Sequence, residues 1–218
     1  MHYEPGYAYP LIVWLHGPGS DERQLLRIMP LVSMRNYVAV APRGESFDRD
    51  GDDPRSGYGW SQSGSAIPQA EGRVFDAIQT ATRKYHISPS KIFLAGFDAG
   101  GTMALRIAMN HPQRFAGVVS FGGSFPRGGS PLGHLAEARQ VSILLAVGRE
   151  SLGYPPKRIC DDLRLFHTAG LSATLRHYPG GHEISPRMLA DLNRWLIEQI
   201  TGSETSADTS EVIWLNDG

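Results

Sequence analysis

Asp98 lies at the centre of a glycine-flanked segment, Gly96-Phe97-Asp98-Ala99-Gly100, which follows an apolar run and precedes a helical pattern. A strand that turns sharply into a helix presents the central side chain of the turn above the end of the sheet. Flanking glycines suit this arrangement because the central residue is strained and packs closely against neighbouring backbone. The N-terminus of the following helix stabilises an anion at the same point. The segment therefore predicts a reactive or ligand-binding position, and its occupant is an aspartate.

His182 follows two glycines, Gly180 and Gly181, in a loop between the last predicted strand and the last predicted helix. Histidine is the side chain best suited to general-base chemistry near neutral pH. A single histidine is more often structural, but this loop position favours a role at the same site as Asp98. Side by side, the carboxylate of Asp98 and the imidazole of His182 would form an ion pair. An imidazolium in such a pair cannot accept a proton from water.

Short apolar runs and longer amphipathic segments alternate along the chain, and they predict strands and helices respectively. The predicted strands are residues 11–15, 37–41, 91–95, 117–121, 142–147 and 173–178. The predicted helices are residues 22–29, 69–85, 99–110, 157–169 and 186–200. Most of the strands are apolar on both faces, as strands between two layers of helices must be. The pattern predicts an α/β fold with a mostly parallel sheet and helices on both of its faces.

The chain length of 218 residues favours a single domain, which we assign to residues 1–200. Residues 201–218 are acidic and rich in Ser and Thr, so we expect a flexible tail there. The first predicted strand begins so close to Met1 that preceding strands in a longer natural chain are an open alternative. Residues 44–67 are rich in Gly, Ser and Asp and predict a long surface loop beside the site. The segment 122–140 is too short to hold a cap domain.

Motifs distributed over residues 11–195 resemble those of the phospholipase/carboxylesterase family, which includes the acyl-protein thioesterases. The matching segments are Leu15-His16-Gly17-Pro18-Gly19, Ala41-Pro42-Arg43-Gly44, Trp60, Lys91 to Leu105, His111-Pro112 and Gly180-Gly181-His182. The resemblance implies an α/β-hydrolase fold without a cap domain and a serine hydrolase that cleaves carboxylic esters or thioesters. In that family a serine, an aspartate and a histidine form the catalytic triad, in this order along the chain.

The resemblance also assigns catalytic positions, and this chain departs from the family at two of the three. Asp98 stands at the position of the nucleophile, and His182 stands at the position of the catalytic base. Ser151 matches the position of the acid. The neighbouring Glu150 is an alternative acid if the loop is shifted by one residue, and otherwise it is a surface charge.

The oxyanion hole that the resemblance implies is altered too. One backbone N–H is expected from Ala99, the residue after the nucleophile position. The other is expected from Pro18, which has no N–H to donate. Gly19 is the alternative donor if the loop shifts. We take Trp60 and Phe97 as candidate substrate-binding residues.

Three classes of function therefore remain open. The first is a degenerate esterase with little or no ordinary ester hydrolysis. The second is an active hydrolase in which Asp98 attacks an alkyl carbon and His182 activates water, as in epoxide hydrolases and haloalkane dehalogenases, which resemble this chain at the turn. The third is a non-catalytic binding module.

The composition narrows the possible partners. The charge is nearly balanced, with 21 Lys and Arg against 22 Asp and Glu, so nucleic acid is not an expected partner. The family resemblance implies a small ester-like molecule as the ligand. No apolar run is long enough to span a membrane. The single cysteine, Cys160, cannot form an internal disulfide, and we expect a cytoplasmic location. No metal-ligand spacing or nucleotide fingerprint occurs, so we expect neither a metal nor an organic cofactor. The sequence predicts no oligomeric state.

Overall fold

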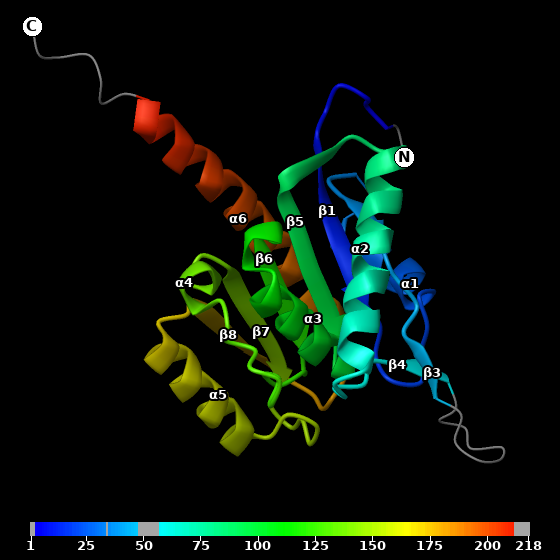
Figure 1. Ribbon diagram of the computed structural model, residues 1–218, viewed down its shortest axis with the longest axis vertical. Helices are drawn as coiled ribbons and strands as arrows, with labels where there is room; N and C mark the ends of the chain where they lie inside the picture. The colour runs from blue at the N-terminus through cyan, green and yellow to red at the C-terminus, as the bar shows by residue number, and fades with distance from the viewer. Residues whose placement is uncertain (1–2, 34, 48–56, 212–218) are drawn as a thin grey trace, which may run out of the picture.

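The computed structural model describes residues 3–33, 35–47 and 57–211, and its centre is a six-stranded parallel sheet (Figure 1). The strands follow the order β2-β1-β5-β6-β7-β8, and each neighbouring pair is parallel. Their bounds are β1 (Tyr9–Leu15), β2 (Val38–Val40), β5 (Ile87–Phe97), β6 (Gly117–Phe121), β7 (Ser142–Gly148) and β8 (Ala173–Tyr178). The predicted strands are thus all present, and the prediction of a parallel sheet is confirmed.

The central strands are buried on both faces because helices cover the sheet from two sides (Figure 1). Alternate residues of one strand therefore enter two different cores: Leu11 and Val13 belong to one, and Ile12 and Trp14 to the other. The first core contains buried side chains of α2 (Ala66–Lys84), α3 (Ala99–Asn110) and α5 (Pro156–Ala169). The second contains those of α1 (Gln24–Val32) and α6 (Pro186–Glu211). The predicted helices on both faces are confirmed.

Some local structure was not predicted. The expected loop 44–67 contains a short antiparallel pair, β3 (Glu45–Phe47) and β4 (Gly57–Gly59). A 3₁₀ turn, η1 (Pro112–Arg114), follows α3, and a short helix, α4 (Leu135–Ala138), precedes β7. These elements have three or four residues each, too few to show a periodic pattern.

The C-terminal helix differs from the prediction in its length. Residues 201–211 continue α6 to Glu211, whereas a flexible tail was expected from residue 201. No proline interrupts this segment, and Thr201 donates a hydrogen bond within the helix to the carbonyl of Ile197 at 2.9 Å. The rest of the predicted tail, residues 212–218, lies outside the described residues. Across the described part of the chain, no helix combines the length and apolarity needed to cross a bilayer.

Candidate active site

Asp98 occupies a strained turn between β5 and α3. Its φ of 50° and ψ of −119° lie in a region that residues with a side chain rarely adopt. The two flanking glycines make the turn possible: a Cβ at Gly96 would lie 2.5 Å from the carbonyl of Gly100. A Cβ at Gly100 would overlap the carbonyl oxygens of Leu15 and His16. The Asp98 side chain is 38% exposed, so the turn presents a carboxylate to solvent.

Asp98, His182 and Ser151 come together in one chain of contacts. His182 Nε2 lies 3.2 Å from Asp98 Oδ2, and His182 Nδ1 lies 2.8 Å from Ser151 Oγ. The Nε2 contact is close, but its alignment does not satisfy the geometry of a hydrogen bond, so we treat it as a charge contact. The residues that the resemblance assigns to the nucleophile and acid positions thus both contact the imidazole, with aspartate and serine exchanged relative to the family's pattern.

This exchange determines where the proton of a neutral His182 resides. The negative charge of Asp98 attracts an N–H group and repels a nitrogen lone pair, so we assign the N–H group to Nε2, facing Asp98. Nδ1 then accepts the hydroxyl proton of Ser151, as inferred from the contacts. In a working serine triad the placement is the reverse, because Nε2 needs a free lone pair to take the proton of the nucleophile.

The His182 ring is held tightly in this orientation. A Cβ at Gly153 would lie 2.5 Å from the ring, and one at Gly122 would lie 2.8 Å from it. The ring of Phe97 has its centroid 5.3 Å from that of His182. The backbone N–H of Tyr154 donates to Ser151 Oγ at 3.2 Å. No sequence pattern indicates Gly122, Gly153 and Tyr154, since only their spatial contacts with His182 and Ser151 distinguish them.

Glu150 does not join this group. Its side chain is exposed, and its backbone N–H donates to the carbonyl of Gly180 at 3.0 Å. Ser151 is 4% exposed and contacts the imidazole instead. Of the two candidates for the acid position, the structure therefore brings Ser151 to His182.

Of the three residues considered as backbone N–H donors to an oxyanion, only Ala99 can serve in this structure. Pro18 lies exposed and has no N–H. The N–H of Gly19 is already used, because it donates to the carbonyl of Tyr58 in β4 at 3.0 Å. Ala99 is the first residue of α3, where backbone N–H groups have no partner within the helix. Gly19 thus does not replace Pro18 as a donor in this conformation, because the β3–β4 hairpin occupies it.

Trp60 stabilises the neighbouring loop from inside rather than facing a ligand. Its indole N–H donates to the carbonyl of His16 at 3.0 Å, and its side chain is buried. His16 Nδ1 lies 2.8 Å from the carbonyl of Gly17, and His16 Nε2 accepts the N–H of Gly44 at 3.0 Å. The prediction of Trp60 as a substrate-binding residue does not fit this burial.

His16 makes the stability of the fold depend on pH. Burial lowers the pKa of His16 below its usual value, because the charged imidazolium is poorly solvated inside the protein. The unfolded chain binds this proton near pH 6.5 and the folded chain does not, so stability falls as the pH drops through that value. Urea denaturation at pH 5.5 and 7.5 should show a larger loss of stability in the wild-type chain than in His16→Gln. Equal losses would contradict this assignment.

A cavity of about 360 Å³ lies beside His182. Phe97, which was proposed as a substrate-binding residue, lines it, and apolar side chains of α1 complete the wall. The other lining residues are Gln24, Arg27, Ile28, Leu31, Glu183, Ile184 and Leu189. Among the described residues, no group of three or more His, Cys, Asp and Glu side chains is placed to hold a metal ion.

Comparisons with known proteins agree with this architecture. Residues 6–200 match the Phospholipase/Carboxylesterase family. A probable carboxylesterase of Oryza sativa subsp. japonica is 28% identical over 158 residues, which are 64% of this chain and 56% of the relative. The putative esterase NocK of Nocardia uniformis subsp. tsuyamanensis is 28% identical over 162 residues, 68% of this chain and 43% of the relative. The matched region thus spans about half the length of these relatives.

Solved structures share the fold. The crystal structure of Arabidopsis thaliana SOBER1 has a TM-score of 0.74 and 20% identity, covering 88% of this chain and all of that one. The carboxylesterase of Bacillus cereus has a TM-score of 0.71 and 16% identity, covering 91% and 92% of the two chains. The α/β-hydrolase fold predicted from the sequence is confirmed, and no cap is evident in the described part of the chain. This chain belongs to the phospholipase/carboxylesterase family of α/β-hydrolases.

Proposed function

We propose that this chain is a degenerate member of its esterase family with little or no ordinary ester hydrolysis. The observation that carries the proposal is the exchange of the two groups that meet His182: Asp98 at Nε2 and Ser151 at Nδ1. Each residue type is present, but each faces the wrong nitrogen for acyl transfer.

Asp98 cannot replace a serine in ester cleavage. Attack of its carboxylate on an ester carbonyl would form an anhydride and expel an alkoxide, which is an uphill exchange. The tetrahedral intermediate would also meet one expected N–H donor, that of Ala99, instead of two. Loss of a single oxyanion donor costs roughly 10²–10³ in rate where it has been measured.

Ser151 is also unsuited to act as a nucleophile, although its hydroxyl contacts an imidazole nitrogen. The residue is 4% exposed, and the N–H of Tyr154 points at its oxygen. A substrate carbonyl would have to reach this oxygen beneath the loop that also brings Gly153 against the His182 ring. Burial therefore favours a positioning role for Ser151.

The second candidate function is alkyl transfer to Asp98. One observation favours it: the carboxylate is 38% exposed at the turn, with an imidazole nitrogen 3.2 Å away. An Asp98 oxygen would bond to the carbon of an epoxide or haloalkane while the carbon–oxygen or carbon–halogen bond breaks. The opened epoxide oxygen would take a proton from solvent, or the halide ion would leave into solvent. His182 would then take a proton from the water that cleaves the resulting ester. The single remaining oxyanion donor disfavours this second step too.

The cavity beside His182 is the proposed ligand site, and its size suits a small ester-like molecule. If the chain has no catalytic activity, we expect this cavity to bind such a ligand, which is the third class of function, a non-catalytic binding module. We also expect a cytoplasmic protein that does not bind nucleic acid. The near-neutral charge supports the last expectation.

Intact-mass spectrometry tests the proposal and its competitors together. The wild-type chain should keep its mass after treatment with excess fluorophosphonate, which labels activated serines. The variant His182→Gln should likewise gain no mass from styrene oxide or 1-chlorohexane, because Asp98 forms no alkyl ester. A fluorophosphonate adduct on Ser151 would contradict the proposal, and an alkyl adduct on Asp98 would establish the second candidate. The matched control is His182→Gln carrying Asp98→Asn, which removes the carboxylate.

A further inference from the structure

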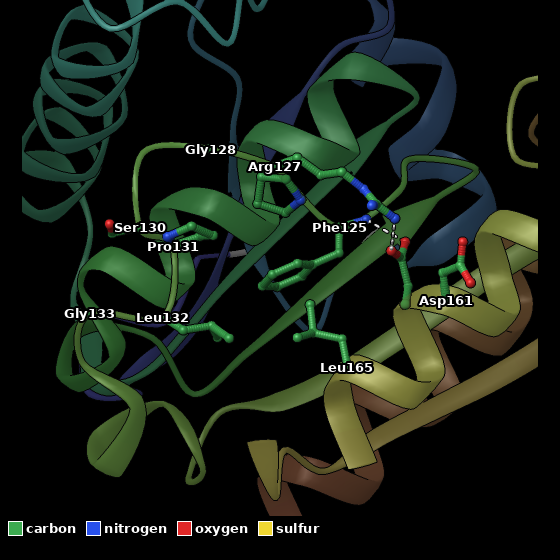
Figure 2. A pocket seen from close by; sticks show the side chains of 11 residues that line it. Phe125, Arg127, Gly128, Ser130, Pro131, Leu132, Gly133, Asp161 and Leu165 are labelled. Carbon is green, nitrogen blue, oxygen red and sulfur yellow. Dashed lines mark hydrogen bonds and ion pairs between the residues drawn. The ribbon is translucent and has the colours of Figure 1, made fainter. Parts of the chain in front are cut away.

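A larger cavity of about 600 Å³ lies between α5 and the segment that follows β6 (Figure 2). It shares no lining residue with the cavity beside His182. Its volume falls within the range of small-molecule sites, roughly 300–1,000 Å³. The family chemistry at Asp98 does not use it.

One wall of this cavity is a loop fixed in an unusual shape by a buried arginine. Arg106 of α3 is 1% exposed and donates to the carbonyls of Arg127 and Gly128 at 3.0 and 2.9 Å. Gly128, Gly129 and Ser130 then adopt φ values of 70°, 66° and 48° in succession. A positive φ at a serine is strained and persists only where the surroundings enforce it. The two hydrogen bonds from Arg106 therefore fix the shape of this loop.

The opposite wall is fixed by a buried aspartate of α5. Asp162 Oδ2 accepts two hydrogen bonds at 2.8 Å, from the N–H of Phe125 and from the hydroxyl of Tyr154. Burial, together with the neighbouring Asp162 charge, raises the pKa of Tyr154, which keeps its hydroxyl protonated as a donor. The second oxygen, Oδ1, lies 3.6 Å from Arg127 Nη2, beyond hydrogen-bond distance. The side chain of Asp162 is 2% exposed and lines the cavity, so one oxygen of this buried carboxylate is held, among the described residues, only by the longer contact with Arg127.

The lining is apolar at one end and charged at the other. Figure 2 shows Phe125, Leu132 and Leu165 converging below the loop. Arg127 Nη2 lies 3.6 Å from Asp162 Oδ1. Asp161 adds a second carboxylate at that end and forms an ion pair with Arg164 at 3.7 Å. Two acidic residues against one basic residue leave the lining with a net negative charge. The side chain of Arg127 is 59% exposed, so it can turn away from Asp162 into solvent.

We propose that this cavity binds a small amphiphilic cation, an aryl- or alkylammonium compound. Its apolar body occupies the space between Phe125, Leu132 and Leu165. Its cationic head takes the place of the Arg127 guanidinium at Asp162 Oδ1, with Asp161 adding to the attraction. The site is independent of the function proposed for Asp98.

Titrations followed by heteronuclear NMR, with three probes of similar size, test the charge preference. The probes are 2-phenylethylammonium, neutral 2-phenylethanol and anionic 3-phenylpropionate. The ammonium compound should bind about three to ten times more tightly than the alcohol, as expected for a partly exposed charge contact, and the anion should bind most weakly. Backbone signals of residues 125–133 and of α5 should shift. Saturable binding of none of the probes, or preferred binding of the anion, would overturn the proposal.

Substitutions of the lining residues give an independent test, because some should strengthen ammonium binding and others should weaken it. Arg127→Gln should strengthen ammonium binding about threefold, because the competing guanidinium is removed from Asp162. Asp161→Asn should weaken it by a similar factor, and Leu165→Trp should abolish it by filling the cavity. Asp76→Asn, an exposed acid on α2, is the matched control and should change nothing. Weaker binding in Arg127→Gln, or unchanged binding in a folded Leu165→Trp protein, would contradict the site.

Discussion

The double variant Asp98→Ser/Ser151→Asp is expected to hydrolyse p-nitrophenyl butyrate at least about 100-fold faster than the wild-type chain. The substitutions return each group to the nitrogen of His182 at which acyl transfer needs it. Removing members of a working triad costs about 10⁴–10⁶ in rate, so restoring them has a large effect. The proline at position 18 still lacks an N–H, which limits the gain by roughly 10²–10³.

The surroundings of residue 151 suit the substitution. The N–H of Tyr154 already points at the side-chain oxygen of Ser151 and would donate to a carboxylate there. That carboxylate would draw the His182 proton to Nδ1 and free the Nε2 lone pair. At position 98 the turn would present a hydroxyl to solvent beside Nε2.

Single variants show whether a gain in hydrolysis requires both substitutions, as the exchange around His182 predicts, or arises from either one alone. Asp98→Ser alone should remain within about tenfold of the wild-type rate, because Ser151 cannot stabilise an imidazolium. Glu150→Gln, which alters the exposed neighbour, should leave the double variant unaffected. Steady-state kcat/KM values provide the comparison. A folded double variant that is no faster than the wild-type chain would contradict the geometry described here.

A pair of glycine-to-alanine substitutions should have opposite effects on stability. Gly100→Ala should lower the free energy of unfolding by roughly 3 kcal/mol, because the new Cβ overlaps the carbonyl oxygens of Leu15 and His16. These oxygens belong to backbone, which cannot move aside as a side chain can. Gly72→Ala, in the middle of α2 with nothing within 4 Å of its Cβ, should raise stability by about 0.5–1 kcal/mol.

Urea denaturation of both variants measures the difference directly. Gly72→Ala serves as the matched control, because the two glycines differ in their surroundings and not in the change made. Comparable stabilities for the two variants would show that the turn at Asp98 is not packed as described.

Much of the fold could be predicted from the sequence because it depends on local patterns. Buried strands such as β6 are continuous apolar runs, and α3 begins and ends at the predicted residues. The positions of Asp98 and His182 followed from glycines that mark a tight turn and a loop. Membership of the family was predicted from the same motifs and is confirmed.

The features that could not be predicted depend on contacts between distant segments. The N–H of Gly19 donates to the carbonyl of Tyr58, which lies in β4. The position of Tyr58 depends on the pairing of β3 with β4, two strands of three residues each. Trp60 was predicted to contact a ligand, whereas in the structure its indole N–H donates to the carbonyl of His16 in the interior. The sequence does not decide whether Glu150 or Ser151 contacts His182. The two residues are neighbours in a loop, where no periodic pattern indicates the direction of a side chain.

The residues that hold the walls of the second cavity could not be predicted from the sequence either. Arg106 and Asp162 lie in amphipathic helices, where a charged residue ordinarily marks a solvent-exposed face. Both are buried in the structure because they hold backbone groups of the segment after β6. These backbone partners are 21 to 37 residues away in sequence, so no local pattern indicates them.

The rate of p-nitrophenyl butyrate hydrolysis by the wild-type chain, compared with His182→Ala, tests the central claim most directly. With Asp98 and Ser151 exchanged around His182, we expect the two proteins to hydrolyse the ester at the same rate. A wild-type rate that is at least tenfold higher and disappears in His182→Ala would show that the site performs ester hydrolysis, and it would contradict the proposed loss of this chemistry.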